Sequence, residues 1–553
     1  MSRRLLLGLA AALALGGGAI ANDADLCSDD AAEASLRAEA CTRLVRTGKY
    51  RGDNLAAVHN NRGIAYRRMN DLARAHGDYT EAVRLNPQYD KAYYNRALAW
   101  SARNNPAQAL EDYTKAIKIN PRFADALNNR GLLWQAKGDG ERALADFDDA
   151  LRANPRMART YFNRGNVHSE KGDLDRAITD YSEAIRLDPN DAEARLNRAN
   201  AWQRKNDYDR AIADYAEAER LNPNDADVPF NRGNAHRLKG DYDKAIADYG
   251  AAIRLAPASA GPYNNRALAW HTKGDYDRAI SDASEAIRID PKYFRAYVNR
   301  GDGYFAKGET RRAVADYSEA LRQSPQAASA LKGRARALAA LGDHDRALND
   351  LTELIRIDPR DHVAFNNRGA AWEGKGDAER AIADYSEALR LDPRYALAYR
   401  NRAAVLARNG ALDRAIADYA QAIRFSPTDA IAFAQRGEIR QRTGDLDRAL
   451  ADYGEAIRLD PRHALAYQHR AGLWQRKGNL GAARSDADQA VALAPERAEA
   501  YLVRANVARG LGRIDDAIDD YQKALELKPS EEARREAEAG IRKLTRTVSP
   551  WDE

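Results

Sequence analysis

The stretch that decides the fold is residues 158–191, ARTYFNRGNVHSEKGDLDRAITDYSEAIRLDPND, because its pattern recurs along most of the chain. Its proline, Pro189, is one of fourteen that follow one another every 34 residues without interruption. A fixed period of this length indicates a solenoid of repeated helical units. With the proline assigned to repeat position 32, fourteen repeats fill residues 56–531, and the first covers residues 56–89.

Each repeat contains the signals for two helices. Position 15 is Gly in eleven repeats and Asn in three (Asn70, Asn104 and Asn206). These are the residues that adopt the left-handed conformation and end a helix. Aspartates follow, as in Asp241 and Asp243, and can cap a second helix. The proline then closes the second helix, because it cannot continue one.

Small and aromatic residues recur at fixed places in both helices. Position 8 is always Gly or Ala, position 20 is always Ala, and position 24 is Tyr in ten repeats and Phe in one. Six of the seven tryptophans stand at position 11. A stripe of aromatic residues could line a cofactor site, but regular placement in one repeat after another indicates a packed core.

These positions resemble the tetratricopeptide repeat family over residues 56–531, with small residues at positions 8, 20 and 27, an aromatic at 24 and proline at 32. The resemblance implies an all-α fold, an α-solenoid in which fourteen tandem helix-turn-helix repeats form a right-handed superhelix. It also implies that the first helix of each repeat lines a concave groove. Members of the family mostly bind peptides or proteins in that groove and have no catalytic machinery of their own.

One departure from the family pattern is a charged pair. Position 7, usually Leu in the family, is Arg in all fourteen repeats, and position 23 is Asp in all fourteen. A guanidinium can form two parallel hydrogen bonds with a carboxylate. The pattern therefore predicts a structural Arg–Asp pair in each repeat. The alternative is that the arginines bind anionic ligands.

Position 6 carries an asparagine in ten repeats, although Asn is a mediocre helix former. An amide both donates and accepts hydrogen bonds, which suits the backbone of an extended peptide. The pattern resembles the asparagine ladder of the superhelical repeats of O-linked N-acetylglucosamine transferase. The alternative is that the amides bond only neighbouring helices. The predicted peptide-binding residues are Asn61, Asn95, Asn129, Asn163, Asn197, Asn231, Asn265, Asn299, Asn367 and Asn401.

Repeats four to six, residues 158–259, add a second asparagine at position 9, one helical turn further along the same face. These three residues complete the predicted site: Asn166, Asn200 and Asn234. Beyond Asn401, position 6 changes to Gln435, His469 and Val503. The best candidate for a peptide-gripping stretch is therefore residues 158–259.

The N-terminus has the pattern of a secretory signal in residues 1–21. Arg3 and Arg4 precede a short apolar run, and Ala19-Ile20-Ala21 offers a cleavage site. The run is too short to span a bilayer, which takes about 20 residues, so we expect no transmembrane segment. The sequence predicts an exported protein, periplasmic or secreted.

The two cysteines, Cys27 and Cys41, follow the predicted cleavage site, and an even count in an oxidising compartment favours a disulfide. On one continuous helix their Cα atoms would lie roughly 21 Å apart, whereas a disulfide needs about 5.5 Å. Either the chain reverses between them, near Ser35, or they remain free or bond to other molecules.

The ends of the array are predicted to be caps. Residues 22–55 form an N-terminal capping segment or partial repeat, with a helix expected over residues 28–47. Residues 532–553 form a C-terminal capping helix and tail, with the helix expected from Ser530 to Arg546. The ninth repeat, residues 328–361, is irregular and could be a hinge, a change of curvature or a drift without consequence.

Several function classes find no support in the sequence. The net charge is +5 over 553 residues, and the charges are too evenly mixed for a nucleic-acid-binding face. The nine histidines lack metal-ligand spacing, and there is no nucleophile elbow or phosphate loop. We therefore expect no enzyme, metal or cofactor. The favoured function is a scaffold, assembly factor or holdase chaperone that binds proteins or extended peptides. The alternative is a structural part of an envelope or polysaccharide export complex.

Overall fold

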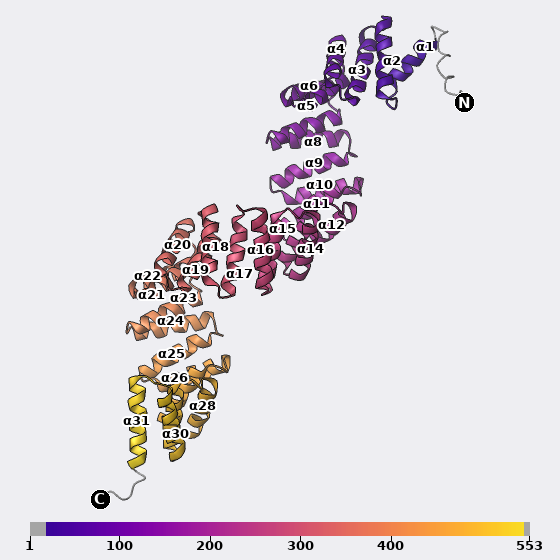
Figure 1. Cartoon of the computed structure of the whole chain (residues 1–553). Helices are drawn as coiled ribbons and strands as arrows, with labels where there is room; N and C mark the ends of the chain where they lie inside the picture. Colours follow the sequence, from indigo (N-terminus) through magenta and orange to yellow (C-terminus); the bar gives the residue numbers. More distant parts are fainter. Residues whose placement is uncertain (1–17, 547–553) are drawn as a thin grey trace, which may run out of the picture. The chain divides into compact units, whose positions relative to one another are not determined.

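The computed structural model describes residues 18–546, and every regular element in that range is an α-helix (Figure 1). The chain divides into two compact units between Ala269 and Trp270, inside helix α15 (Ala260–Thr272). The helices before this division are α1(Gly18–Ser28), α2(Ala34–Thr47), α3(Gly52–Arg68), α4(Leu72–Leu85), α5(Asp90–Ala102), α6(Pro106–Ile119), α7(Ala124–Ala136), α8(Gly140–Ala153), α9(Ala158–Glu170), α10(Leu174–Leu187), α11(Ala192–Arg204), α12(Tyr208–Leu221), α13(Asp227–Lys239) and α14(Tyr242–Leu255).

The second unit continues the same alternation of helices. Its elements are α16(Tyr276–Ile289), α17(Phe294–Ala306), α18(Thr310–Gln323), α19(Ala328–Ala340), α20(His344–Ile357), α21(His362–Gly374), α22(Ala378–Leu391), α23(Ala396–Arg408), α24(Leu412–Phe425), α25(Ala430–Arg442), α26(Leu446–Leu459), α27(Ala464–Arg476), α28(Leu480–Leu493), α29(Ala498–Gly510), α30(Ile514–Glu526) and α31(Glu531–Arg546).

From α3 to α30 the helices form the fourteen predicted hairpins, with odd-numbered first helices and even-numbered second helices. The residue at position 15 has a positive φ in every repeat, for example 58° at Asn70 and 92° at Gly240, as the turn signal predicts. Most predicted caps are present, and Asp173 accepts a hydrogen bond from the Arg176 amide at 3.2 Å. Asp241, in contrast, makes no capping bond to its own helix α14, so that cap was predicted wrongly.

Within each unit, every first helix packs against its own second helix and against the second helix of the preceding hairpin. First helices of successive hairpins also contact one another, as α9 and α11 do in the first unit and α21 and α23 do in the second. Their side chains therefore form a continuous surface within each unit. We call it the first-helix surface, and its members are the residues of the odd-numbered helices that are not covered by second helices.

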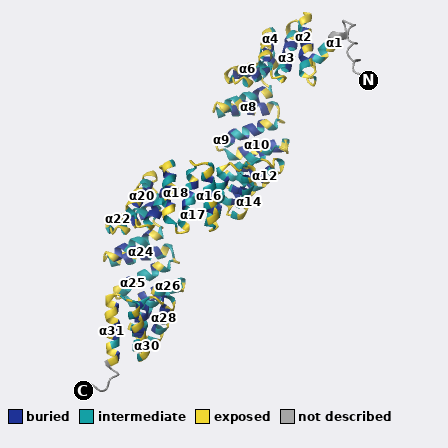
Figure 2. Cartoon of the chain, viewed as in Figure 1, coloured by how far each residue is buried: buried dark blue, intermediate teal, exposed yellow. Residues whose placement is uncertain are grey.

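The core is made of the small and aromatic residues that the repeat pattern singled out. In the fourth repeat Ala177, Tyr181 and Ala184 are buried, and Figure 2 shows buried residues where neighbouring helices meet. A Cβ added to Gly165 at position 8 would lie 2.8 Å from Cε1 of Tyr181, so a larger residue would collide with the ring. Tryptophans at position 11 pack on these clusters, which confirms their core role: Trp100, Trp134, Trp202, Trp372 and Trp474.

The predicted Arg–Asp pairs are present in thirteen repeats; the seventh repeat crosses the division between the units and is not counted. In the fifth repeat, Arg198 donates from Nε and Nη2 to the two carboxylate oxygens of Asp214, both at 2.7 Å. Its Nη1 donates to Ser182 Oγ on the preceding second helix at 3.0 Å. Arg198 therefore joins its first helix to two second helices, whereas Arg436 and Arg470 bond only the aspartate of their own repeat.

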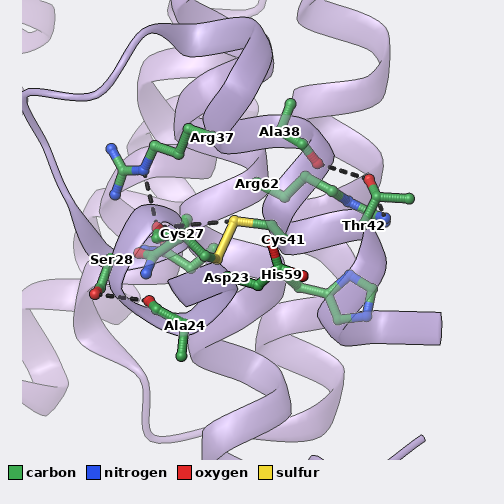
Figure 3. The surroundings of a disulfide bond; sticks show 12 residues. Asp23, Ala24, Cys27, Ser28, Arg37, Ala38, Cys41, Thr42, His59 and Arg62 are labelled. Carbon is green, nitrogen blue, oxygen red and sulfur yellow. Dashed lines mark hydrogen bonds between the residues drawn. A yellow bond between two sulfur atoms is a disulfide. The ribbon is translucent and has the colours of Figure 1, made fainter. Parts of the chain in front are cut away.

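The N-terminal segment holds the two cysteines (Figure 3). Residues 29–33 reverse the chain between α1 and α2, so the helix expected over residues 28–47 is interrupted there, and the turn precedes Ser35. The reversal brings the Cα atoms of Cys27 and Cys41 to 5.0 Å and their sulfur atoms to bonding distance, 2.07 Å. The signal sequence predicted in residues 1–21 lies mostly outside the described residues.

At the other end, α31 packs on α29 and α30 through Ala533, Ala537 and Leu544. It occupies the place of the first helix of a fifteenth repeat, and residues 547–553 lie outside the described range. The ninth repeat keeps the helix lengths of its neighbours, with Leu351 and Leu354 buried in its core. The structure therefore gives this repeat a regular hairpin and no interruption.

Candidate functional site

The asparagines at position 6 lie on first helices, and six of the ten link their helix to the first helix before it. Asn95 Nδ2 donates to Asn60 Oδ1 at 2.9 Å, and Asn401 Nδ2 donates to Asn366 Oδ1 at 3.1 Å. Four further donations follow the same direction along the chain: Asn129 to the Tyr94 hydroxyl, Asn163 to Asn128, Asn197 to Asn166, and Asn265 to Asn234. These six amides therefore bond neighbouring helices, which both the ligand-contact prediction and its alternative allow.

The predicted site residues differ in how far they are open to a ligand. Asn95 and Asn163 are buried, with 7% and 4% of their surface exposed, so little of either amide can meet another molecule. The other eleven are half-buried. Bonding to a neighbouring helix and contact with a ligand are compatible for these eleven, because each amide has more than one hydrogen-bonding group.

Sequence reasoning missed the position-5 asparagines that accept these bonds. Asn60, Asn128 and Asn366 are buried and each accepts from the ladder asparagine of the following repeat. All three directly precede a ladder asparagine, so the dipeptide Asn-Asn was a visible signal. An unbonded buried amide is costly, which explains why two asparagines stand together.

In repeats four to six the position-9 asparagines are held by the core tyrosines. The hydroxyl groups of Tyr181 and Tyr249 donate to Oδ1 of Asn166 and Asn234, each at 2.8 Å. Tyr215 donates to Asn200 Oδ1 at 2.6 Å. Burial raises the pKa of all three hydroxyls, that of Tyr249 to about 12, so each keeps its proton at physiological pH. The amides at position 9 therefore have a fixed orientation.

The first-helix surface presents exposed aliphatic side chains in repeats eleven to thirteen. Position 2 carries Leu397, Ile431 and Leu465, which are 36%, 49% and 39% exposed. In repeats four to six the same position carries Arg159, Glu193 and Asp227. We call the three aliphatic residues the aliphatic row. The asparagine ladder and the aliphatic row are therefore two different surfaces on one type of helix.

Two other features, a metal-binding cluster and a membrane-spanning helix, are absent from the described residues. No group of three or more His, Cys, Asp or Glu side chains within residues 18–546 could hold a metal ion. None of the helices in that part of the chain is long and apolar enough to cross a bilayer. The geometry offers hydrogen-bonding amides and exposed aliphatic groups along a helical surface.

The hairpins follow one another in one unbroken 34-residue register, which defines an α-solenoid. Hydrogen-bonding groups along the first helices give this solenoid a surface suited to binding. Profiles described as "Tetratricopeptide repeat" match residues 56–89, 90–123, 133–192, 162–226, 260–293, 298–362, 435–487 and 498–531. A further profile described as "TPR repeat" matches residues 233–274 and 374–410. The chain therefore belongs to the tetratricopeptide repeat family.

Three solved structures illustrate what the chain is similar to. A chain of the APC/C hetero-tetramer Cut9–Hcn1 is 14% identical, with 84% of this chain and 98% of that chain covered and a TM-score of 0.39. Yeast Tom70 is 17% identical, with coverages of 90% and 98% and a TM-score of 0.35. YrrB, a TPR protein with an unusual peptide-binding site, is 26% identical, with coverages of 34% and 96% and a TM-score of 0.32. No curated protein sequence matches the chain significantly.

Proposed function

We propose that the protein is a non-catalytic scaffold outside the cytoplasm that binds extended peptides or protein segments along its first-helix surface. The observation that carries the proposal is the row of amide side chains at position 6, present in ten of fourteen repeats and all on first helices. A repeated amide offers a repeated hydrogen-bonding group to a chain lying along the array.

Continuity of the surface supports this function. First helices contact one another within each unit, so amides from successive repeats follow one another without an intervening second helix. In six repeats a hydrogen bond to the preceding first helix holds the amide in place before a ligand arrives. Such preorganisation lowers the entropy cost of binding.

The N-terminal segment supports export. The first described side chain with a strong contact is Asp23, which forms an ion pair with Arg43 at 2.8 Å, two residues beyond the predicted cleavage site. Cys27 and Cys41 lie at bonding distance and are buried. A structural disulfide is typical of proteins in oxidising compartments. Removal of residues 1–21 would shorten α1 at its N-terminal end and would keep the Asp23–Arg43 ion pair and both cysteines.

A photo-crosslinking residue on the first-helix surface tests the binding function. The probe replaces Glu193, which is exposed at position 2 of α11, and crosslinking is done in living cells followed by mass spectrometry. The matched control places the probe at Ala213, which is exposed on the second helix α12 of the same repeat. We expect the first probe to capture polypeptides and the control to capture few of them.

The captured molecules distinguish the forms of this function. One or a few recurrent proteins would identify a dedicated scaffold, and many unfolded chains would identify a holdase. Equal capture at both positions, or capture of nothing, would contradict binding on the first-helix surface. Constant components of an envelope complex, captured at both positions, would indicate the export-complex role instead. Cell fractionation with and without residues 1–21 tests the location, and a cytoplasmic full-length protein would contradict export.

A further inference from the structure

Arginine recurs at position 29, near the end of the second helix, in eleven of the fourteen repeats. In nine of these repeats the arginine forms an ion pair with the acidic residue at position 26, as Arg220 does with Glu217 at 2.7 Å. In the sixth repeat position 26 is Ala251. Arg254, at position 29 of this repeat, is exposed and forms no ion pair or hydrogen bond with another described residue. Its guanidinium is therefore available to another molecule.

Two arginines at position 7 show which group the outer nitrogen atom of this side chain binds. Besides its bonds to the aspartate of its own repeat, Arg164 donates from Nη1 to Oδ1 of Asp148 at 2.6 Å. Arg232 likewise donates from Nη1 to Oε2 of Glu219 at 2.7 Å. Asp148 stands at position 25 and Glu219 at position 28 of the preceding second helix. The arginines at positions 7 and 29 therefore both bind carboxylates of second helices where these are present.

In the sixth repeat the two kinds of arginine meet over a glycine. Positions 25 and 28 of its second helix α14 are Gly250 and Ile253, so neither offers a carboxylate. A Cβ added to Gly250 would lie 3.6 Å from Nη1 of Arg266, at position 7 of the next repeat, and 3.7 Å from Nη1 of Arg254. Two guanidinium groups therefore face one point that no side chain of Gly250 fills. A guanidinium has five N–H donors, so Arg266 can bind a group here while it bonds elsewhere.

We propose that Arg254 and Arg266 bind a carboxylate over Gly250, supplied by an Asp or Glu side chain of a partner protein. The site lies on the second-helix side of the array and does not depend on binding by the first-helix surface. Both guanidinium groups can donate to one carboxylate, and such charge-assisted hydrogen bonds are strong. Leu255, next to Arg254, is 41% exposed and offers an apolar contact. A protein partner can use both features, whereas inorganic phosphate can use only the arginines.

Substitutions at Gly250 test the preference for a carboxylate within the chain itself. G250D places a carboxylate at position 25, where Asp148 stands in the third repeat, whereas G250A adds only a methyl group. Asp is a poorer helix former than Ala, so without the two arginines G250D would be the less stable variant. We expect the opposite order, seen as slower hydrogen exchange of the α14 amides in G250D than in G250A. Equal or faster exchange in G250D would overturn the inference.

A binding assay on the full chain tests the partner. The probes are fluorescently labelled hexaglutamate and hexaglutamine peptides, and fluorescence polarisation measures their affinities. We expect hexaglutamate to bind the wild type, and R254Q and G250D to bind it at least about fivefold more weakly. The matched controls make the same charge changes elsewhere. R220Q removes an arginine that is already paired with Glu217, and G454D adds a carboxylate at position 25 of the twelfth repeat. Both controls should bind within about twofold of the wild type.

Each contrary result has its own meaning. If hexaglutamate binds neither form, or binds the wild type and R254Q equally well, the two arginines do not form the site and the inference is overturned. If hexaglutamine binds as tightly as hexaglutamate, no carboxylate is recognised. If calorimetry shows that only inorganic phosphate binds, and that R254Q loses this binding, the ligand is a small anion and the partner-protein assignment is overturned. Crosslinking from Glu193 tests the first-helix surface separately, so failure of one test leaves the other unaffected.

Discussion

Repeats four to six and repeats eleven to thirteen share one hairpin and differ in the surface that it presents. Both groups have first helices of 13 residues and second helices of 14 residues. Both have the same Arg–Asp pair, as in Arg164–Asp180 and Arg436–Asp452. On the first helices, however, repeats four to six present asparagines at positions 6 and 9, whereas repeats eleven to thirteen keep only Asn401 of these and present the aliphatic row at position 2.

The difference separates two sets of positions within one repeat. Positions 7, 8, 20 and 23 hold the helices together and do not vary in type across the fourteen repeats. Positions 2, 6 and 9 lie on the first-helix surface and vary between the two groups. A solenoid can therefore change its binding chemistry along its length without changing its stack, because each repeat contacts only its neighbours.

The largest effect is expected from breaking the Arg–Asp pair that both groups of repeats share. Asp180→Ala in the fourth repeat and Asp418→Ala in the eleventh leave Arg164 and Arg402 without their main partner, and each should cost about 2 kcal/mol of local stability. The cost is below that of a fully buried pair, because the Arg164 side chain is 22% exposed. Native-state hydrogen exchange of the amides in the affected repeat measures the loss.

The control for this pair is Glu183→Ala, which removes only the exposed partner of Arg186 and should cost less than about 0.5 kcal/mol. Equal costs in the two groups would confirm a common stack. A large cost in one group and none in the other would mean that the pairs have different roles.

The second effect separates buried from open members of the asparagine ladder. Asn163→Ala should cost about 1.5 kcal/mol of stability, because Asn163 is buried and the change removes its hydrogen bond to Asn128. Asn231→Ala should cost less than about 0.5 kcal/mol, because Asn231 is half-buried and makes no side-chain hydrogen bond among the described residues. Urea unfolding followed by circular dichroism compares the two variants. Equal losses would show that burial does not distinguish them.

The third effect is expected from adding a ladder asparagine to the fourteenth repeat. Gln468 Oε1 is buried and unpaired within the described chain, and Val503 stands at position 6 of the following repeat, where a ladder asparagine would donate. Val503→Asn should supply a donor and raise the stability of this repeat by about 1 kcal/mol. Hydrogen exchange of helix α29 measures the gain. Val503→Ala is the control, since it offers no donor and should not stabilise.

The fourth effect concerns pH at the ladder position of the thirteenth repeat. Burial lowers the pKa of His469 below its ordinary 6.5, so between the two values the unfolded chain binds more protons than the folded one. The stability of this repeat is therefore complete above pH 6.5 and falls as the pH is lowered below it. His469→Asn should remove part of this acid sensitivity. The measurement is the difference in melting temperature between pH 7.5 and pH 5.5 for both proteins, and an unchanged difference would contradict the assignment.

The smallest effect is expected from the aliphatic row. Leu397→Gln, Ile431→Gln and Leu465→Gln should each change stability by at most about 0.5 kcal/mol, because these side chains are largely exposed and Gln is a good helix former. Thermal unfolding of the triple variant measures this. A loss of several kcal/mol would show that these residues belong to the core and would end the contrast between the two groups.

Features that repeat within one hairpin could be predicted from the sequence. The hairpin boundaries, the turn residue at position 15, the core role of the tryptophans and the Arg–Asp pairs follow from spacing and residue type alone. They are predictable because the groups involved belong to the same or adjacent turns of two packed helices. The fourteen repetitions also average out local exceptions such as Asp241, which makes no cap.

Hydrogen bonds between repeats could not be predicted in the same way. Asn163 reaches Asn128, 35 residues away, while Asn197 reaches Asn166, 31 residues away. The choice between these partners depends on which amide of the preceding helix is within reach. Sequence periodicity gives the face of a helix but does not give the lateral offset of its neighbour. The chain reversal before α2 was predicted near Ser35 and lies at residues 29–33. The sequence could not place it more closely, because no repeat pattern covers the N-terminal segment.

Helix α31 covers the last hairpin of the array. Gly540 of this helix lies against Tyr521, in the way that Gly333 of the ninth repeat lies against Tyr317 of the eighth. Its core contacts are those of a next repeat, but no second helix follows it within the described residues, and its outer side carries charged groups such as Arg534, Arg535 and Glu538. Without α31, the last hairpin would offer an open docking face to the first helix of another molecule. A head-to-tail contact of this kind does not close on itself and leads to filaments. The charged helix thus covers the face of the last hairpin on which such a contact would form.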